Sequence, residues 1–171
     1  AGDVVGIPNH GALRIGDTLT EGEDLRFLGI PSFAPEIVRR VRLDDAIKAT
    51  KLKKALQELA EEGVVQLFTP LDGSPPLVGV IGALQLDVLA DRLQNEYGLA
   101  TVFETSSFET VRWISAATRP ELDAFIAKNR SAIAHDLDGA PVFLAQSAFM
   151  LQWTEERAPE IAFAAIRTTV A

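Results

Sequence analysis

The chain has 171 residues, 47% of them apolar and 23% charged, and carries a formal net charge of −8. This length allows one large domain or two small ones, and the apolar share excludes an intrinsically disordered chain. No apolar run approaches the roughly 20 residues that a membrane-spanning helix needs, and the absence of cysteine excludes disulfides and thiolate metal sites. The two histidines, His10 and His135, leave little material for a histidine-rich metal centre.

Residues 1–29 predict a β-hairpin. Two short apolar runs, 4–7 and 13–15, flank a turn sequence of Pro, Asn, His and Gly. Because an isolated hairpin is only marginally stable in water, we expect this segment to be the end of a β-barrel domain whose other strands lie elsewhere. The chain begins with neither a Met nor a signal peptide, which is typical of a piece of a longer protein. Residues 30–35 contain two prolines and predict an extended connector.

Residues 36–104 predict an α+β unit with the element order βαββαβ, the split βαβ or ferredoxin-like arrangement. Glycine follows each of its two amphipathic helices, as expected at helix ends. The predicted elements are a strand at 37–43, a helix at 46–62, strands at 64–69 and 77–81, a helix at 83–97 and a strand at 100–104.

Residues 105–171 predict a second α+β unit that is compatible with the same order. Its pattern is weaker, because the apolar segment 142–151 fits a strand or a helix equally well. The sequence leaves open whether this unit forms its own sheet or extends the first one. The predicted elements are a strand at 110–115, a helix at 119–129, a hairpin of 132–135 and 142–145, a helix at 149–158 and a strand at 161–166.

Leu84 and Val88 form a second, smaller apolar stripe on the predicted helix 83–97, nearly opposite its main stripe. A helix that is apolar on two sides usually has neighbours on two sides. We therefore expect Leu84 and Val88 to contact the C-terminal unit near Trp113 or Trp153, and we expect both tryptophans to pack in that unit. The alternative is that Leu84 and Val88 are simply exposed.

Positive charge is concentrated in one segment of this acidic chain. Seven of the 16 Lys and Arg residues lie between positions 39 and 54. Segment 37–60 carries a net charge of +4, so the remainder carries −12. A basic island on an acidic protein is a candidate contact for phosphate groups.

Four residues of this island are the predicted contact site for RNA, and we call them the basic site: Arg40, Arg42, Lys48 and Lys51. In a strand, Arg40 and Arg42 share one face, and we expect it to be the open, helix-free face of the sheet. Two alternatives remain open. The lysines belong to an ordinary solvated helix face, or the arginines form ion pairs with the acidic remainder and hold domains together.

The chain has no motif that would supply catalysis or nucleotide binding. It lacks a phosphate-binding loop, a dinucleotide-binding Gly-rich loop and a nucleophile elbow. The neighbours His135 and Asp136 have no third partner nearby in sequence, and Asp87 and Asp91 lie on the polar side of a predicted helix. We therefore predict no catalytic, cofactor-binding or metal-binding residue in this chain, and we expect His10 to fill a turn.

Five segments, taken together and in order, resemble one protein family. They are 2–11 with 15–18, 27–36, 39–43, 79–88, and the pair Arg112 and Trp113. The family is peptide-chain release factor 3. Residues 2–11 and 15–18 resemble the end of its second, β-barrel domain, 27–36 the connector into its third domain, and 39–43 the strand that follows. Residues 79–88 resemble the Gly-x-Leu-x-Leu-Asp element shared with elongation factor G, and Arg112 and Trp113 also fit the family. That family consists of translational GTPases related to elongation factor G. The resemblance covers essentially the whole chain.

The resemblance implies a function in translation termination in the cytoplasm. The parent protein would bind GTP and GDP in a domain outside this chain, enter the ribosome and eject the stop-codon-reading release factors. The implied partners are ribosomal RNA and ribosomal protein, with the other release factors as indirect partners, and neither DNA nor membrane. This chain would itself be no enzyme and would hold no cofactor. The fold alone is equally compatible with a tandem ferredoxin-like regulatory or small-ligand-binding module.

Overall fold

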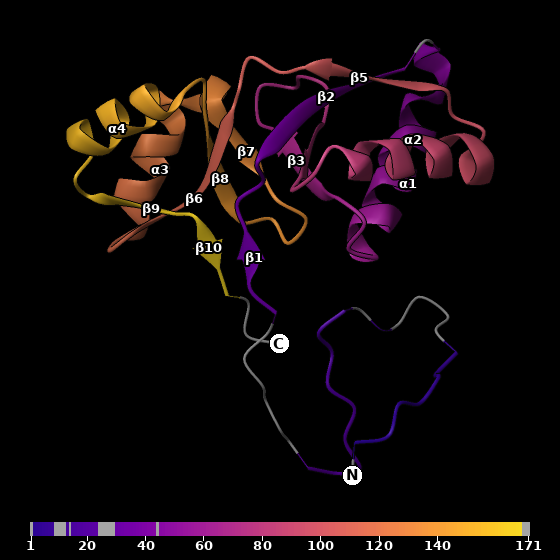
Figure 1. Ribbon diagram of the computed structural model, residues 1–171. Helices are drawn as coiled ribbons and strands as arrows, with labels where there is room; N and C mark the ends of the chain where they lie inside the picture. The colour runs from indigo at the N-terminus through magenta and orange to yellow at the C-terminus, as the bar shows by residue number, and fades with distance from the viewer. Residues whose placement is uncertain (1, 9–12, 14, 24–29, 44, 169–171) are drawn as a thin grey trace.

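One antiparallel sheet runs through both predicted α+β units (Figure 1). The structure is a computed structural model that describes residues 2–8, 13, 15–23, 30–43 and 45–168. Within these residues the sheet has eight strands in the order β5-β2-β4-β3-β7-β8-β6-β9, and β1 and β10 form a separate ribbon. The elements in chain order are β1 (Ser32–Phe33), β2 (Ile37–Leu43), η1 (Ala46–Lys48), α1 (Ala49–Glu61), β3 (Gln66–Pro70), β4 (Leu77–Val80), α2 (Leu84–Tyr97), β5 (Thr101–Thr105), β6 (Thr110–Ala116), α3 (Arg119–Lys128), η2 (Arg130–Ala132), β7 (Ile133–His135), β8 (Pro141–Ala145), α4 (Ala148–Arg157), β9 (Ile161–Ala164) and β10 (Ile166–Arg167).

The first unit, β2-α1-β3-β4-α2-β5, has the predicted ferredoxin-like arrangement. Its strands pair antiparallel in the order β5-β2-β4-β3, so each helix connects two strands that have another strand between them. Helix α1 buries its predicted apolar stripe, which includes Leu52, Leu56 and Leu59, against this sheet. Gly63 and Gly98 follow the two helices with φ angles of +74° and +63°, which glycine adopts without steric cost.

The second unit, β6-α3-β7-β8-α4-β9, repeats the same order, with its strands arranged β7-β8-β6-β9. Helix α3 begins with a capping box between Thr118 and Glu121. Ser147 divides the ambiguous apolar segment 142–151 into a strand and a helix, because its Oγ accepts a hydrogen bond from the backbone N–H of Met150 at 3.2 Å. The mixed α+β class is thus confirmed, and the second unit resembles the first in topology.

The second unit extends the sheet of the first, which settles the question that the sequence left open. Strands β3 and β7 pair antiparallel, with Thr69 opposite His135 and Pro70 opposite Ala134. Four strands separate β2 from β6 in the sheet, yet Val38 of β2 and Val111 of β6 belong to one buried cluster. The sheet therefore bends over, and the helix-free faces of its two halves pack against each other.

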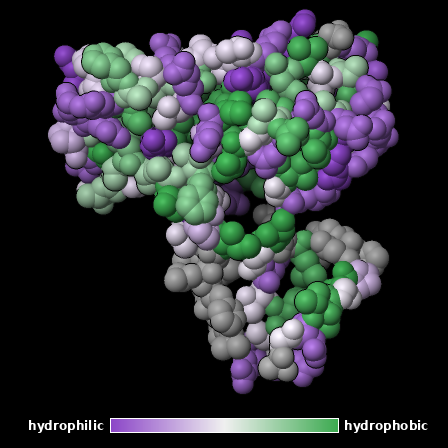
Figure 2. All heavy atoms as spheres, viewed as in Figure 1, coloured by the Kyte–Doolittle hydropathy of each residue, from purple (hydrophilic) through white to green (hydrophobic). Residues whose placement is uncertain are grey.

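Three hydrophobic clusters lie between the resulting layers. One packs α1 and α2 on the first half of the sheet, one lies between the two halves, and one packs α3 and α4 on the second half. In the outer cluster of the second unit, the rings of Phe125, Phe143 and Phe163 pack in tilted and edge-to-face arrangements, with centroids 5.6–5.9 Å apart. Figure 2 shows polar side chains over the outer parts of both units, with apolar side chains gathered between them.

The connector before β2 is fixed to both units. Ser32 and Phe33 pair with Arg167 and Ile166 to form the β1–β10 ribbon. The Gln66 Nε2 amide donates to the Phe33 carbonyl oxygen at 2.7 Å. Figure 1 shows this ribbon leaving the folded body on the same side as the N-terminal segment.

The packing of the two halves corrects two predictions made from the sequence. The helix-free face of the first unit is not open, because the second unit covers Val38 and its neighbours there. The second unit therefore does not dock on α2, and Leu84 and Val88 are 79% and 52% exposed. The expected contact of Leu84 and Val88 with the C-terminal unit is wrong.

Two further predictions also require correction. Trp113 is buried between the two halves of the sheet, whereas Trp153 is 42% exposed on α4 and does not pack in the core. Within the described residues of the N-terminal segment, 4–7 and Ile15 form no strand, so the expected hairpin is not found there. A hairpin without neighbouring strands has little to stabilise it. Its predicted turn, with His10, lies outside the described residues.

Candidate functional site

The basic site lies at one end of the first unit, where β2 leads through a short link into η1 and α1. Arg40 and Arg42 belong to β2, whereas Lys48 ends η1 and Lys51 lies in the first turn of α1. Both lysine side chains are exposed. The structure therefore places all four residues on neighbouring elements, although the two arginines differ in their surroundings.

Arg42 lies in an ion pair across the sheet. Its Nε is 2.6 Å from Oε1 of Glu104 on the edge strand β5, and the two side chains are 55% and 40% exposed. An exposed pair of this kind contributes about 0–1 kcal/mol. Because water competes for both partners, the Arg42 guanidinium can exchange Glu104 for another anion at little cost.

Arg40 is half-buried and does not project freely from the sheet. Among the described residues its Nε has no hydrogen-bond partner, although that atom is buried. The backbone N–H of Ser74 is the main cause that lowers the pKa of Asp72, and the charge of Arg40 contributes to the same shift. Arg40 is therefore close enough to the β3–β4 turn for its charge to act on Asp72, and its partial burial corrects the expectation that it projects from an open face.

A largely apolar cavity of about 470 Å³ opens beside the basic site. It lies between α1, the end of β2 and the β3–β4 turn, and Arg42 and Lys53 are the charged residues on its border. Sequence reasoning missed this cavity, because no local pattern predicts a space between α1, β2 and the β3–β4 turn. Its apolar wall includes Val41, Leu43, Ala49, Leu52, Leu56, Leu67, Pro70, Pro75 and Pro76.

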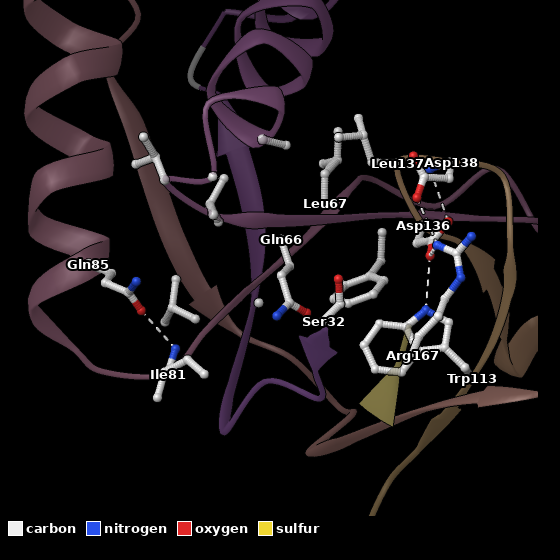
Figure 3. Close-up of a pocket in the computed structure, with 17 residues that line it drawn as sticks. Ser32, Gln66, Leu67, Ile81, Gln85, Trp113, Asp136, Leu137, Asp138 and Arg167 are labelled. Atoms are coloured by element: carbon white, nitrogen blue, oxygen red, sulfur yellow. Dashed lines mark hydrogen bonds and ion pairs between the residues drawn. The ribbon is translucent and has the colours of Figure 1, made fainter. Parts of the chain in front are cut away.

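A second cavity, of about 270 Å³, lies between the two units and is built around Asp136 (Figure 3). The Asp136 Oδ2 accepts hydrogen bonds from the Trp113 Nε1–H at 2.9 Å and from the Arg167 Nη1–H at 2.6 Å. Its Oδ1 accepts from the backbone N–H groups of Asp138 and Ala140. This carboxylate therefore joins β6, β10 and the β7–β8 turn, and none of these contacts involves the neighbouring His135.

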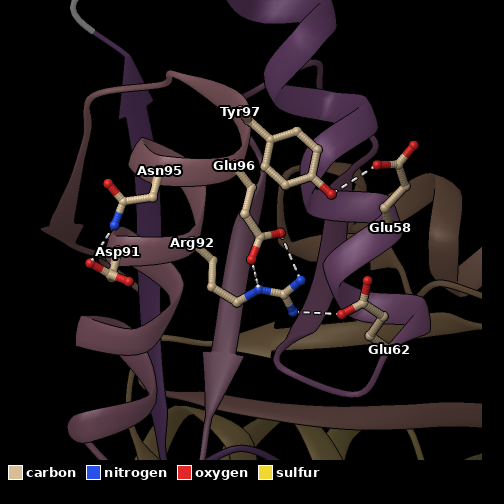
Figure 4. Close-up of polar contacts among 7 residues, drawn as sticks. All are labelled: Glu58, Glu62, Asp91, Arg92, Asn95, Glu96 and Tyr97. Carbon is tan, nitrogen blue, oxygen red and sulfur yellow. Dashed lines mark hydrogen bonds and ion pairs between the residues drawn. The ribbon is translucent and has the colours of Figure 1, made fainter.

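A polar cluster fastens α2 to α1 on the surface of the first unit (Figure 4). The Arg92 guanidinium donates to both carboxylate oxygens of Glu96, at 2.6 and 2.7 Å, and to Oε2 of Glu62 at 2.5 Å. The Tyr97 hydroxyl donates to Oε2 of Glu58 at 2.8 Å. The hydrogen bonds from Arg92 lower the pKa of Glu96, and those to Glu96 and Glu62 raise the pKa of Arg92.

The contacts of this cluster predict a raised pKa for Tyr97, the single tyrosine of the chain. Burial, with a further contribution from the hydrogen bond to Glu58, raises the pKa of Tyr97 from 10.0 to about 12. Because the pKa is higher in the folded state, the stabilisation is complete below pH 10.0 and is lost as the pH rises towards about 12. An alkaline titration followed by tyrosinate absorbance should show this delay. Glu58→Gln should lower the folded-state midpoint only partly, and a wild-type midpoint near 10.0 would contradict the assignment.

The two carboxylates Asp87 and Asp91 do not form a metal site with other ligands. Asp91 Oδ1 accepts a hydrogen bond from the Asn95 side chain at 2.7 Å. The described residues contain no group of three or more His, Asp or Glu side chains arranged to hold a metal ion. Among the same residues, no helix combines the length and the apolar character needed to cross a membrane.

The comparison with protein families agrees with the resemblance seen in the sequence. Residues 27–155 match the family described as class II release factor RF3, C-terminal domain. The match covers well over half of the chain. The chain belongs to this family. It is therefore a release factor 3 domain, associated with translation termination. The matched segment includes both ferredoxin-like units up to α4 and contains the whole basic site.

Proposed function

We propose that this chain is the ribosome-binding C-terminal part of a GTP-dependent release factor 3. It acts in the cytoplasm at translation termination and promotes the release of the stop-codon-reading factors from the ribosome. A GTP- and GDP-binding domain elsewhere in the parent protein supplies the GTPase activity. The match of residues 27–155 to the release factor 3 family carries this proposal.

The architecture supports a role in transmitting motion between domains. The connector pairs with β10 and packs on β4, so residues 32–36 belong to the same body as the two units. A movement of the preceding domain would therefore act on the whole eight-stranded sheet instead of on a flexible linker. The basic site offers this body a contact for ribosomal RNA phosphates, because guanidinium and ammonium groups bind phosphate through charge-assisted hydrogen bonds.

A reconstituted termination assay tests the proposed function. The full-length factor should accelerate dissociation of a stop-codon-reading factor from ribosomes, and the same factor without residues 30–167 should not. GTP binding by the shortened factor should persist, because no nucleotide-binding motif lies in the deleted part. Equal acceleration by both proteins would show that this domain is dispensable for the reaction.

Charge removal at the basic site tests the proposed RNA contact. Lys48→Ala/Lys51→Ala should weaken ribosome binding and lower the slope of log affinity against log salt by about one for each phosphate that is no longer bound. Because both lysines are exposed, the melting temperature should stay unchanged. Arg40→Ala/Arg42→Ala should weaken binding and also lower the melting temperature, since Arg42 pairs with Glu104 and the charge of Arg40 acts on Asp72.

The matched control is Arg119→Ala/Lys128→Ala, which removes the same charge from α3 in the second unit. It should leave the salt slope unchanged. If the arginine pair lowers only the melting temperature and the lysine pair changes nothing, the basic site is structural and the RNA contact lies elsewhere.

A further inference from the structure

Helix α4 presents aromatic side chains to solvent on the side opposite the core. Its inner side is fixed by Leu151, Thr154 and Ala158, which are at most 9% exposed. Phe149 and Trp153, one helical turn apart, are 72% and 42% exposed. In Figure 1, α4 lies on the outer side of the second unit, away from the first. No other described element therefore covers this side of the helix.

The exposed side chains are of the kinds that dominate protein interfaces. Aromatic residues, Met and Arg are enriched in interface cores, and Trp and Arg are frequent hot spots. Met150, which is 38% exposed, lies beside Phe149, and the Arg157 guanidinium carbon lies 4.1 Å from the centre of the Trp153 ring. This cation–π contact holds the indole in one orientation, which lowers the entropy cost of binding. We call Phe149, Met150, Trp153 and Arg157 the α4 surface.

The charges around the α4 surface decide which kind of partner it fits. Glu156 lies on the same side of α4 as Phe149 and Trp153, three residues after Trp153, and the exposed Glu160 follows the end of the helix. The one cation of the surface, Arg157, already lies over Trp153. The whole chain carries −8. A polyanion such as RNA would be repelled by these carboxylates, whereas a basic segment would be attracted.

We propose that the α4 surface binds a basic, amphipathic protein segment. Apolar side chains of the partner would cover Phe149 and Trp153, and its Lys or Arg side chains would pair with Glu156. The inference rests on the proposed function in so far as the partner is sought among the proteins of the ribosomal termination complex. The second unit would thus contact a protein, and this contact would be separate from the RNA contact proposed for the basic site.

The first test compares two pairs of exposed apolar residues. Phe149→Ser/Trp153→Ser should weaken binding of the full-length factor to purified ribosomes at least tenfold. The control, Leu84→Ser/Val88→Ser, removes an exposed pair with the same spacing from α2 and should change affinity less than twofold. The α2 variant should keep a melting temperature close to that of the wild type, whereas the α4 variant should lose some stability, because Trp153 is only 42% exposed and contacts Arg157. Binding is therefore compared at a temperature at which both variants are folded. Wild-type affinity of the α4 variant, or equal losses in both variants, would overturn the proposal.

The second test separates a protein partner from RNA. Glu156→Lys should weaken ribosome binding if the partner is a basic protein, whereas it should strengthen binding if the partner is RNA. A photoreactive benzoylphenylalanine in place of Trp153 should cross-link to a protein of the irradiated complex. The proposal would be overturned by cross-links to RNA alone, or by the absence of any cross-link when all ribosomes carry the factor. If the wild-type factor does not bind ribosomes, the proposed function fails as well, whereas wild-type binding that is indifferent to these changes refutes only the α4 contact.

Discussion

Gly79→Ala is expected to lower the free energy of unfolding by about 2–3 kcal/mol, the upper part of the range of about 1–3 kcal/mol for overpacking a filled interior. Gly79 lies in the buried strand β4, between the connector and the core. A Cβ atom there would come within 2.7 Å of Pro35 Cγ and 2.8 Å of Phe68 Cε2. Both contacts are closer than carbon atoms tolerate, and neither group is the free end of a flexible chain. The connector or the Phe68 ring must therefore move.

The control is Gly82→Ala, the same chemical change in a place where a Cβ atom meets no other atom within 4 Å. This substitution should be neutral or stabilising by up to about 1 kcal/mol, because alanine restricts the unfolded chain. Urea unfolding of both variants measures the difference. If Gly79→Ala were as stable as Gly82→Ala, Pro35 would not be packed against the sheet, and the connector would not be part of the folded body.

This close approach also shows the limit of what the sequence predicts. The two prolines and Gly79 lie more than 40 positions apart, and no local pattern connects them. The elements themselves are local features, and their prediction from apolar spacing and from helix-ending glycines such as Gly63 and Gly98 is confirmed. Strand ends differ by one or two residues, because pairing with a neighbouring strand decides where a strand ends.

The relation between the two units could not be derived in the same way. The β3–β7 pairing involves only Thr69, Pro70 and two residues of β7, and their sequence carries no signal for a partner. Once that pairing brings the helix-free faces together, it decides which other side chains are buried and which stay exposed. Leu84 and Val88 stay exposed, and Arg40 is half-buried. Periodicity shows that a face is apolar, but it does not show which partner covers it.

The candidate sites also differ in how much of each can be predicted from local sequence and how much depends on tertiary packing. The charge count predicts the basic site from sequence alone, and its contact with RNA stays a prediction. The spacing of Arg92 and Glu96 could have revealed one half of their cluster. The other half, Glu62, is the C-cap residue of α1, and its contact with Arg92 depends on the antiparallel packing of the two helices. For α4, the helical spacing of Phe149 and Trp153 is visible in the sequence, but their outward direction depends on which side of the helix the sheet binds.

Asp136→Ala is expected to cost about 3 kcal/mol of unfolding free energy, at the low end of the range for a broken buried ion pair. The Asp136 and Arg167 side chains are only 10% and 24% exposed. Removing the carboxylate leaves the buried Trp113 Nε1–H without its acceptor, and it leaves Arg167 with Asp138 alone. The two backbone N–H groups that Oδ1 binds in the β7–β8 turn lose their acceptor as well.

The loss of stability should extend beyond the β7–β8 turn, because Arg167 belongs to β10 and β10 pairs with the connector strand β1. Hydrogen exchange at Phe33 and Ile166 should therefore accelerate in Asp136→Ala, along with a change in the fluorescence of Trp113. Asp138→Ala is the matched control. It removes the other carboxylate that binds Arg167, but this side chain is 40% exposed, so the loss should be about 0.2–1 kcal/mol. If the two variants lost the same small amount, Asp136 would be only a turn residue, and the β1–β10 ribbon would be held by its backbone hydrogen bonds alone.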